Sequence, residues 1–443
     1  MTALPLALPH VVIVGGGFAG LSAARALADA PVRITLVDRR NHHLFQPLLY
    51  QVATAALNPG DIAYPIRSVL RRQRNARTIL ARAERVDAAR RTLVLADGEV
   101  AYDYLILAPG AGQSYFGHDD WETWAPGLKT IEDALEIRRR VLSAFEAAER
   151  EPDPSRLPAM LTFVIVGGGP TGIELAGALL EIGRHTVARD FRSFDPTTLR
   201  VVLIEAAPRL LPPYSEKLSA AARAQLERLG VEVRTGAHVT GIDETGVSLG
   251  DERIEARTVL WAAGVAASPL GRSLGAPLDR AGRVRVEPDL SVPGHPEVFV
   301  AGDLMAIEQG GHPVPGIAPA AIQAGEAAAH NVLARAAARE TKPFHFVDKG
   351  SLATIGRAAA VGRIGRLEVT GFLAWLVWWL IHIAYLIGFR NRIAVMIGWA
   401  WQYFAFARGA RLITGRSWEP HLAPPPPSAT TPPSRPAPEG KAE

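Results

Sequence analysis

VVIVGGGFAG at residues 11–20 and FVIVGGGPTG at residues 163–172 are two copies of one pattern. In each copy, four apolar residues that favour β-strands run into glycines spaced G-x-G-x-x-G, and a helix-like stretch follows. The first glycine allows a sharp turn, the second lets the backbone approach a pyrophosphate, and the third lets helix and strand pack closely. One such pattern alone is weak, because glycine-rich turns also occur for structural reasons. Two complete copies predict two dinucleotide-binding sites.

An acidic residue closes the strand that follows each fingerprint. Asp38 comes 18 residues after Gly20, close to the usual spacing, and Glu205 comes 33 residues after Gly172. We attribute the longer spacing to extra residues around 189–198. An acid at this place accepts hydrogen bonds from ribose hydroxyls and repels a 2′-phosphate. Glu205 therefore favours NADH over NADPH, and the alternative is a solvated carboxylate at a strand end.

Three further strands are predicted to run into glycines, and one of them ends in an acid. They are LILAPG (105–110), VLWAAG (259–264) and PEVFVAGD (296–303). Ligands of parallel sheets bind at the carboxyl ends of the strands. Asp303 is therefore placed to hydrogen-bond a ribityl or ribose hydroxyl, unless it is only a turn or N-cap aspartate.

Composition and charge narrow the class of protein. With 443 residues, 48% hydrophobic and 21% charged, the chain can form about two or three globular domains. A net charge of +4 does not indicate nucleic acid. The chain has no cysteine, which excludes disulfides, thiolate metal sites and thiol redox chemistry. No metal site is expected. The N-terminus does not resemble a signal peptide, so we expect a cytoplasmic catalytic body.

Together these features resemble the flavoproteins with two dinucleotide-binding domains, and most of all the type II NADH dehydrogenases, which are non-proton-pumping NADH:quinone oxidoreductases. The closer match lies in four stretches: HHLFQPLLYQVAT (42–54), APAAIQAGEAAAHN (318–331), DKGSLATIGRAAAV (348–361) and GFRNR (388–392) with its Trp-rich flanks. The resemblance spans roughly residues 10–420. Relatives such as disulfide reductases and sulfide:quinone reductases use cysteines, which this chain lacks.

The resemblance implies FAD in the first site and NADH in the second. It places Asp38 on the adenosine ribose, the backbone of Val86 at the adenine, and Asp303 along the ribityl chain. The residues it implies for FAD are Gly15, Gly16, Gly17, Phe18, Ala19, Gly20, Asp38, Arg39, Val86, Gly110, Asp303 and Ala318. Those it implies for NADH are Gly167, Gly169, Gly172, Glu205 and Gly264.

The resemblance also suggests two catalytic residues. NADH would pass a hydride to the flavin, which would pass two electrons to a quinone. Glu174 matches an acidic residue at the nicotinamide side and could relay protons, whereas Gln323 matches a glutamine of the quinone site and could orient a carbonyl. The alternatives are a glutamate in the first turn of a helix and a glutamine on a helix surface. The family often has glutamine where this chain has Pro319; a helix beginning near Ala318 would aim its positive end at the flavin ring.

The C-terminal part suggests attachment to a membrane. Residues 371–418 contain no acidic residue, five arginines and six of the nine tryptophans. Tryptophan favours the membrane interface, and arginine favours anionic head groups. The apolar runs at 372–388 and 393–407 fall at or below the length of about 20 residues that spans a bilayer. We expect two helices lying in the interface; the alternative is an apolar dimer interface. His382 is expected to be a packed or interfacial residue.

We therefore predict an α/β protein with two Rossmann-like domains and a C-terminal membrane-associating helical segment. Residues 1–120 and 286–340 would bind FAD, 121–285 NADH and 341–420 the membrane, and the proline-rich tail at 421–443 would be disordered. The expected partners are a membrane quinone (ubiquinone or menaquinone), the lipid surface at the cytoplasmic face of the cell membrane, and a second copy of the chain. Two other functions stay open: reduction of a protein electron carrier, and a membrane-tethered NADH sensor with little turnover.

Overall fold

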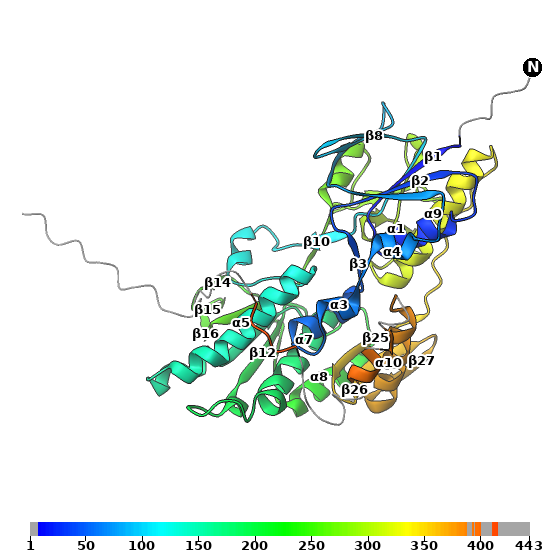
Figure 1. Cartoon of the computed structure of the whole chain (residues 1–443). Helices are drawn as coiled ribbons and strands as arrows, with labels where there is room; N and C mark the ends of the chain where they lie inside the picture. The colour runs from blue at the N-terminus through cyan, green and yellow to red at the C-terminus, as the bar shows by residue number, and fades with distance from the viewer. Residues whose placement is uncertain (1–7, 388–391, 394, 400–409, 415–443) are drawn as a thin grey trace, which may run out of the picture.

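The computed structural model describes residues 8–387, 392–393, 395–399 and 410–414. Most of the second apolar run and the whole proline-rich tail lie outside the described residues. Figure 1 shows one α/β domain at the upper right, a second at the lower left, and a smaller C-terminal unit at the lower right.

The first domain is built around β1 (His10–Val14), the strand that leads into the first fingerprint. Its sheet has the order β20-β21-β9-β1-β2-β5, and every strand except the antiparallel edge strand β20 runs parallel to β1. All five residues of β1 are buried, as in parallel sheets that are covered on both faces. The other strands are β2 (Arg33–Asp38), β5 (Ala76–Leu80), β9 (Tyr104–Leu107), β20 (Ser291–Val292) and β21 (His295–Val300).

Two helices and a small sheet share the core of this domain. The helices are α1 (Phe18–Ala26), which follows the fingerprint, and α9 (Ala318–Ala336), which packs on it. The expected helix start near Ala318 is thereby confirmed. The small antiparallel sheet consists of β6 (Ala83–Asp87), β7 (Thr92–Leu95) and β8 (Gly98–Ala101).

The second domain repeats the first around β11 (Thr162–Val166). Its parallel order β13-β12-β11-β17 matches β5-β2-β1-β9, so the duplication in sequence is also one in structure. Phe163 and Ile165 pack with the helices, whereas Val164 and Val166 pack with a three-stranded sheet. The elements are α5 (Ile131–Arg150), α7 (Pro170–Glu181), β12 (Arg200–Glu205), α8 (Glu216–Leu229), β13 (Glu232–Thr235), β14 (Gly241–Asp243), β15 (Gly246–Leu249), β16 (Glu252–Glu255) and β17 (Thr258–Trp261).

An antiparallel ribbon joins the two domains. Strand β10 (Ala111–Gln113) carries the chain out of the first domain, and β18 (Val265–Ala267) returns beside it. After the return, Leu270 and Leu274 already pack in the first domain's core. The ribbon and these two leucines mark where the chain re-enters the first domain among the described residues.

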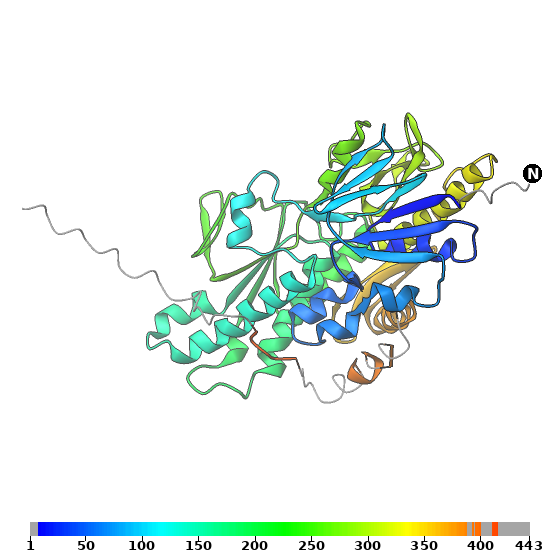
Figure 2. The same ribbon diagram turned by 45° about the horizontal axis from the view of Figure 1, so that its top comes forward.

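The C-terminal unit is an antiparallel sheet followed by one long helix. The sheet consists of β25 (Gly350–Gly356), β26 (Ala359–Ile364) and β27 (Leu367–Thr370), and α10 (Gly371–Tyr385) packs against it. The unit presses on the second domain so closely that a Cβ at Gly177 of α7 would lie 1.6 Å from the carbonyl oxygen of Ile355. Figure 2 shows α10 close to the first domain as well, and Ile387 packs against that domain's core.

Two of the tryptophans expected at a membrane interface lie in the protein core. Trp378 is 2% exposed and Trp399 is 8% exposed. Their rings contact each other, with centroids 5.4 Å apart. In the part of the chain that the structure describes, no helix is both long and apolar enough to cross a membrane.

Shorter elements connect these units. They include β3 (His42–Leu44), α2 (Leu49–Ala53), α3 (Pro59–Ile62), β4 (Ala63–Pro65), α4 (Ile66–Leu70), α6 (Leu157–Met160), β19 (Val284–Arg285), β22 (Met305–Ala306), β23 (Glu308–Gln309) and β24 (His312–Pro313).

Candidate functional site

The first fingerprint leaves open space where a pyrophosphate is needed. Gly15 has φ +100°, and a Cβ there would lie 2.1 Å from the carbonyl oxygen of Ala108. A Cβ at Gly20 would lie 1.8 Å from the carbonyl oxygen of Gly15. At Gly17, the N-cap of α1, no described atom lies within 4 Å of a Cβ. The loop is therefore closed on the protein side and open at the helix N-terminus, which fits a dinucleotide.

The second fingerprint has the same geometry. Gly167 has φ +116°, and a Cβ there would lie 2.7 Å from the backbone of Ala262. A Cβ at Gly172 would lie 1.8 Å from the carbonyl oxygen of Gly167. Gly169, the N-cap of α7, has open space among the described atoms. Both loops thus fit a pyrophosphate for the same physical reasons.

Each acid at a strand end accepts hydrogen bonds from the backbone of its own fingerprint loop and of the residues that follow the strand. Asp38 accepts hydrogen bonds from the backbone N–H groups of Gly16 (2.6 Å) and Arg40 (2.7 Å). Glu205 accepts from Gly168 (2.5 Å) and Ala207 (2.7 Å) in the same way. These bonds fix both carboxylates beside the open side of the loops and leave lone pairs for a ribose.

A cavity of about 700 Å³ lies between the two domains and brings predicted residues together from four parts of the chain. They are Phe18 of the first fingerprint, Glu174 of α7, Asp303 after β21 and Ala318 at the start of α9. The helix start turns a positive dipole end toward this cavity. We call it the flavin cavity.

The sequence alone missed Lys129, Tyr50 and Gln46, which also line the flavin cavity. Burial lowers the pKa of Lys129, and the nearby carboxylate of Asp303 raises it in part. The composition could have pointed to Lys129. Only five of the chain's 48 basic residues are lysines, so a lysine is the unusual choice of basic residue at any position.

Other predicted residues lie away from the flavin cavity or have backbone partners. The N–H of Val86 donates to Ser273 Oγ (3.0 Å). The amide of Gln323 donates to the carbonyl of Val347 (3.1 Å) and accepts from its N–H (2.9 Å). Gly110 and Gly264 sit next to the ribbon between the domains, each with φ +74°.

Three further residues that the sequence assigned to FAD lie in the first domain. Gly16 packs beside Asp38, Ala19 is buried against α9, and Arg39 is exposed beyond the end of β2. Among the described residues, no group of three or more His, Asp or Glu side chains is placed to hold a metal ion.

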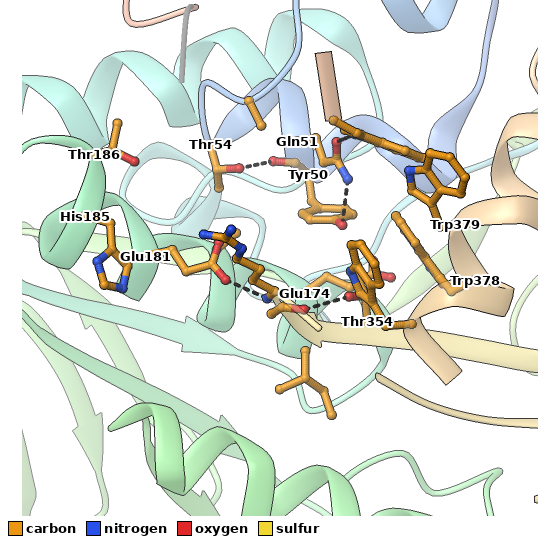
Figure 3. Close-up of a pocket in the computed structure, with 17 residues that line it drawn as sticks. Tyr50, Gln51, Thr54, Glu174, Glu181, His185, Thr186, Thr354, Trp378 and Trp379 are labelled. Carbon is orange, nitrogen blue, oxygen red and sulfur yellow. Dashed lines mark hydrogen bonds between the residues drawn. The ribbon is translucent and has the colours of Figure 1, made fainter. Parts of the chain in front are cut away.

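A second cavity of about 810 Å³, partly open to solvent, lies between α2, α7, β25 and α10 (Figure 3). We call it the outer cavity. Glu174 and Tyr50 line both cavities and form the wall between them. The other lining residues are Gln51, Thr54, Ala56, Ala178, Glu181, His185, Thr186, Thr354, Ile355, Gly356, Arg357, Trp375, Trp378, Trp379 and Trp399.

The surroundings of Glu174 favour the protonated form of its carboxyl. Burial raises the pKa of Glu174 well above its usual value, although the N–H of Thr354 donates to the carboxyl and opposes the rise. Nearby, burial raises the pKa of Tyr214 to about 12. The raised pKa makes the protonated form of Glu174 more available than that of an exposed glutamate, so its carboxyl can serve as a proton donor to a bound molecule.

A chain of hydrogen bonds fixes the wall residue Tyr50. Gln51 Nε2 donates to Tyr50 Oη (2.9 Å), and Trp399 Nε1 donates to Gln51 Oε1 (2.6 Å). The C-terminal unit thus helps to position a residue that lines both cavities. His382 stacks on Trp378 (4.2 Å), and burial lowers its pKa to about 4, so it is a packed residue.

Comparisons with known proteins agree with this geometry. The family model described as pyridine nucleotide-disulphide oxidoreductase matches residues 9–325. The chain is 48% identical to the type II NADH:quinone oxidoreductase Ndh of Mycobacterium tuberculosis over 93% of this chain and 92% of the relative. It is 31% identical to the type II NADH:quinone oxidoreductase of Staphylococcus haemolyticus over 82% of this chain and 91% of the relative.

Solved structures share the fold. The NDH2 of Plasmodium falciparum in complex with NADH matches with a TM-score of 0.82 at 19% identity, covering 92% of this chain and 100% of the other. The sulfide:quinone oxidoreductase of Aquifex aeolicus matches with a TM-score of 0.66 at 19% identity, covering 88% of this chain and 92% of the other.

Proposed function

We propose that this chain, which belongs to the type II NADH:quinone oxidoreductases, uses its two cavities for the two halves of one reaction. The enzyme oxidises NADH and reduces a quinone with FAD as its redox cofactor, so the expected family, activity and cofactors are confirmed. Because the chain belongs to this family, we set aside the two other functions that the sequence left open. These were reduction of a protein electron carrier and a membrane-tethered NADH sensor.

The residues assigned to the cofactors keep their roles in this proposal. When bound, FAD would supply the redox chemistry that links NADH oxidation to quinone reduction. Gly17 and the start of α1 would hold its pyrophosphate, and Asp38 its ribose. Asp303, Lys129 and the start of α9 surround the flavin cavity. The residues for NADH are Gly167, Gly169, Gly172, Glu205 and Gly264.

The outer cavity is the proposed quinone site. The observation that supports this assignment is that two residues line both the outer cavity and the flavin cavity. Glu174 and Tyr50 face the flavin cavity on one side and the outer cavity on the other. A flat apolar ring fits the tryptophan faces, and Glu174 can donate a proton to a reduced carbonyl oxygen. Gln323 has a positioning role in this proposal. Its amide N–H donates to the carbonyl of Val347 and its amide oxygen accepts from the N–H of Val347, so it links α9 to that segment.

We further propose that α10 attaches the enzyme to the cytoplasmic face of the cell membrane without spanning it. Its exposed side chains include large apolar ones, such as Leu373 (57% exposed) and Leu380 (54% exposed). A long-chain quinone, ubiquinone or menaquinone, would then pass from lipid into the adjacent outer cavity. A second copy of the chain is the other partner that such an apolar face can bind, and a homodimer is part of the proposal.

The quinone site can be tested by filling the outer cavity. Ala178 lines it from α7, so Ala178→Phe should slow quinone reduction by about tenfold or more, since an overfilled site excludes the ring. Reduction of the flavin by NADH is the internal reference, and Ala224→Phe on the exposed face of α8 is the matched control. Equal rates of quinone reduction in both variants would contradict the assignment.

A further inference from the structure

The reaction needs a proton from solution at the proposed quinone site. NADH, quinone and one proton give NAD⁺ and quinol, so the hydride from NADH supplies two electrons and one of the two hydrogens. The other hydrogen enters as a proton in every turnover. Glu174, the acid of the proposed quinone site, lines both cavities, and the outer one is partly open to solvent. After Glu174 has donated its proton, its carboxylate must take up another proton from the solvent.

Helix α7 carries a line of side chains from Glu174 toward solvent. Glu174, Ala178 and Glu181 follow each other at intervals of four and three residues, which places them on one face of α7, and His185 lies in the helical segment that continues it. All four line the outer cavity. In Figure 3, Glu181 lies between Glu174 and His185.

The outer end of this line has an unusual backbone. A π-helical segment, Ile182–Thr186, follows α7, and such segments are frequent at functional sites. It places His185 where its side chain is exposed to solvent while still lining the cavity. Glu181 is half-buried and accepts a hydrogen bond from the N–H of Arg357 (2.7 Å), so its carboxyl is held in place.

We propose that Glu181 and His185 form the inward proton path that recharges Glu174 from solvent, an inference that rests on the proposed quinone site. The rise along α7 from Glu174 to Glu181 is about 10 Å, which is too far for direct transfer. Water entering the outer cavity from its solvent-open side would bridge this gap beside its polar lining residues, Thr54, Thr186 and Thr354.

The charged and titratable groups around this path come from every neighbouring element. They are Arg184 on the same segment, Arg357 after β25, Tyr50 on α2, Tyr214 before α8, Asp190 and Arg411 beyond His185, and Lys129 and Asp303 across the flavin cavity. The raised pKa of Glu174 fits the proposal, because an acid that favours its protonated form takes up a proton readily after each turnover. A rival path through Lys129 and Asp303 would bypass Glu181.

The test uses the FAD-loaded enzyme under anaerobic conditions. NADH reduces the flavin, a short-chain quinone reoxidises it, and the rate of each step is followed by flavin absorbance over a range of pH and in D₂O. In Glu181→Gln the amide oxygen can still accept from the N–H of Arg357, so the contact is kept while the proton relay is lost. We expect reoxidation to slow at least about tenfold relative to flavin reduction, with a larger solvent isotope effect.

Rescue and control variants separate a relay from a structural role. Glu181→Asp, which keeps a carboxyl, should recover most of the rate. Imidazole in solution should accelerate reoxidation of His185→Ala. Glu227→Gln on α8, outside the outer cavity, is the matched control and should behave as the unaltered enzyme.

Two outcomes overturn different statements. If Glu181→Gln and His185→Ala keep the rate, pH profile and isotope effect of the unaltered enzyme, the proton path is wrong while the quinone site stands. If quinone fails to reoxidise even the unaltered enzyme, the proposed function fails first.

Discussion

At the residue scale, the paired acids Asp38 and Glu205 show how one side chain can serve both fold and specificity. Each accepts two backbone hydrogen bonds from its own loop, so its position is fixed before any ligand binds. We propose that the carboxylate of Glu205, positioned in this way beside its loop, carries the preference for NADH over NADPH.

Replacing Glu205 tests that preference. Glu205→Gln keeps an acceptor for the loop but removes the negative charge that repels a 2′-phosphate. We expect the ratio of kcat/KM for NADPH to that for NADH to rise about tenfold, which corresponds to about 1.4 kcal/mol. Glu232→Gln, a partly buried acid on β13, is the control, and an unchanged ratio in Glu205→Gln would contradict the assignment.

The buried acid Glu174 should make stability depend on pH. Its pKa is raised well above the usual value on folding, so the folded state holds this proton more tightly than the unfolded state. The contribution is fully present below the unfolded pKa and is lost as pH rises through the raised folded pKa. Between the unfolded pKa and the raised folded pKa of Glu174, thermal unfolding of Glu174→Gln should be less sensitive to rising pH than that of the unaltered enzyme. Parallel curves for the two proteins would contradict a raised pKa at Glu174.

At the scale of elements, α7 joins the second domain to the C-terminal unit. The contact depends on Gly177, where a Cβ would meet the carbonyl oxygen of Ile355 at 1.6 Å. Backbone atoms cannot move aside as a flexible side chain can. We therefore expect Gly177→Ala to lower the free energy of unfolding by about 2–3 kcal/mol, measured by denaturant titration. Gly60→Ala, with open space among the described atoms, is the control; equal loss in both would contradict this packing.

A buried arginine fixes α2, the element that carries Tyr50. Arg138 of α5 donates from Nε and Nη2 to the carbonyl of Val52 (2.8 and 2.5 Å) and from Nη2 to that of Leu57 (2.7 Å). Arg138→Leu leaves both carbonyls without these donors and should cost about 3 kcal/mol. Because Tyr50 then loses its support, KM for quinone should rise more than KM for NADH. Steady-state kinetics with both substrates would show this, and equal changes would argue against a positioning role.

The parts that the sequence could predict are those encoded locally. Both strand–turn–helix units follow from neighbouring residues, and so does the start of α9 at Ala318. Lys129 could not be placed in the flavin cavity, because that cavity combines stretches far apart in the chain. Trp378 and Trp399 were expected at a lipid interface, yet they pack on each other and on α2, since hydrophobicity alone does not separate a buried face from a lipid-facing one.

At the scale of the whole molecule, the proposed membrane face makes a prediction about lipid binding. Leu380 of α10 is 54% exposed, and burying such a side chain in lipid contributes roughly 1.5–3 kcal/mol. Leu380→Glu should therefore weaken binding to anionic liposomes about tenfold or more in a sedimentation assay. The control is Leu80→Glu, which changes a leucine of similar exposure (59%) on β5 of the first domain. Equal binding by the two variants would contradict a membrane face on α10.

The central claim is that electrons pass from NADH through the flavin to a quinone within one molecule, and a single anaerobic mixing experiment tests it most directly. The FAD-loaded enzyme receives one equivalent of NADH, and a short-chain quinone is added after the flavin absorbance has fallen. We predict that the absorbance returns at once, and that NADPH bleaches the flavin far more slowly than NADH. A flavin that NADH reduces but quinone leaves reduced would contradict the claim.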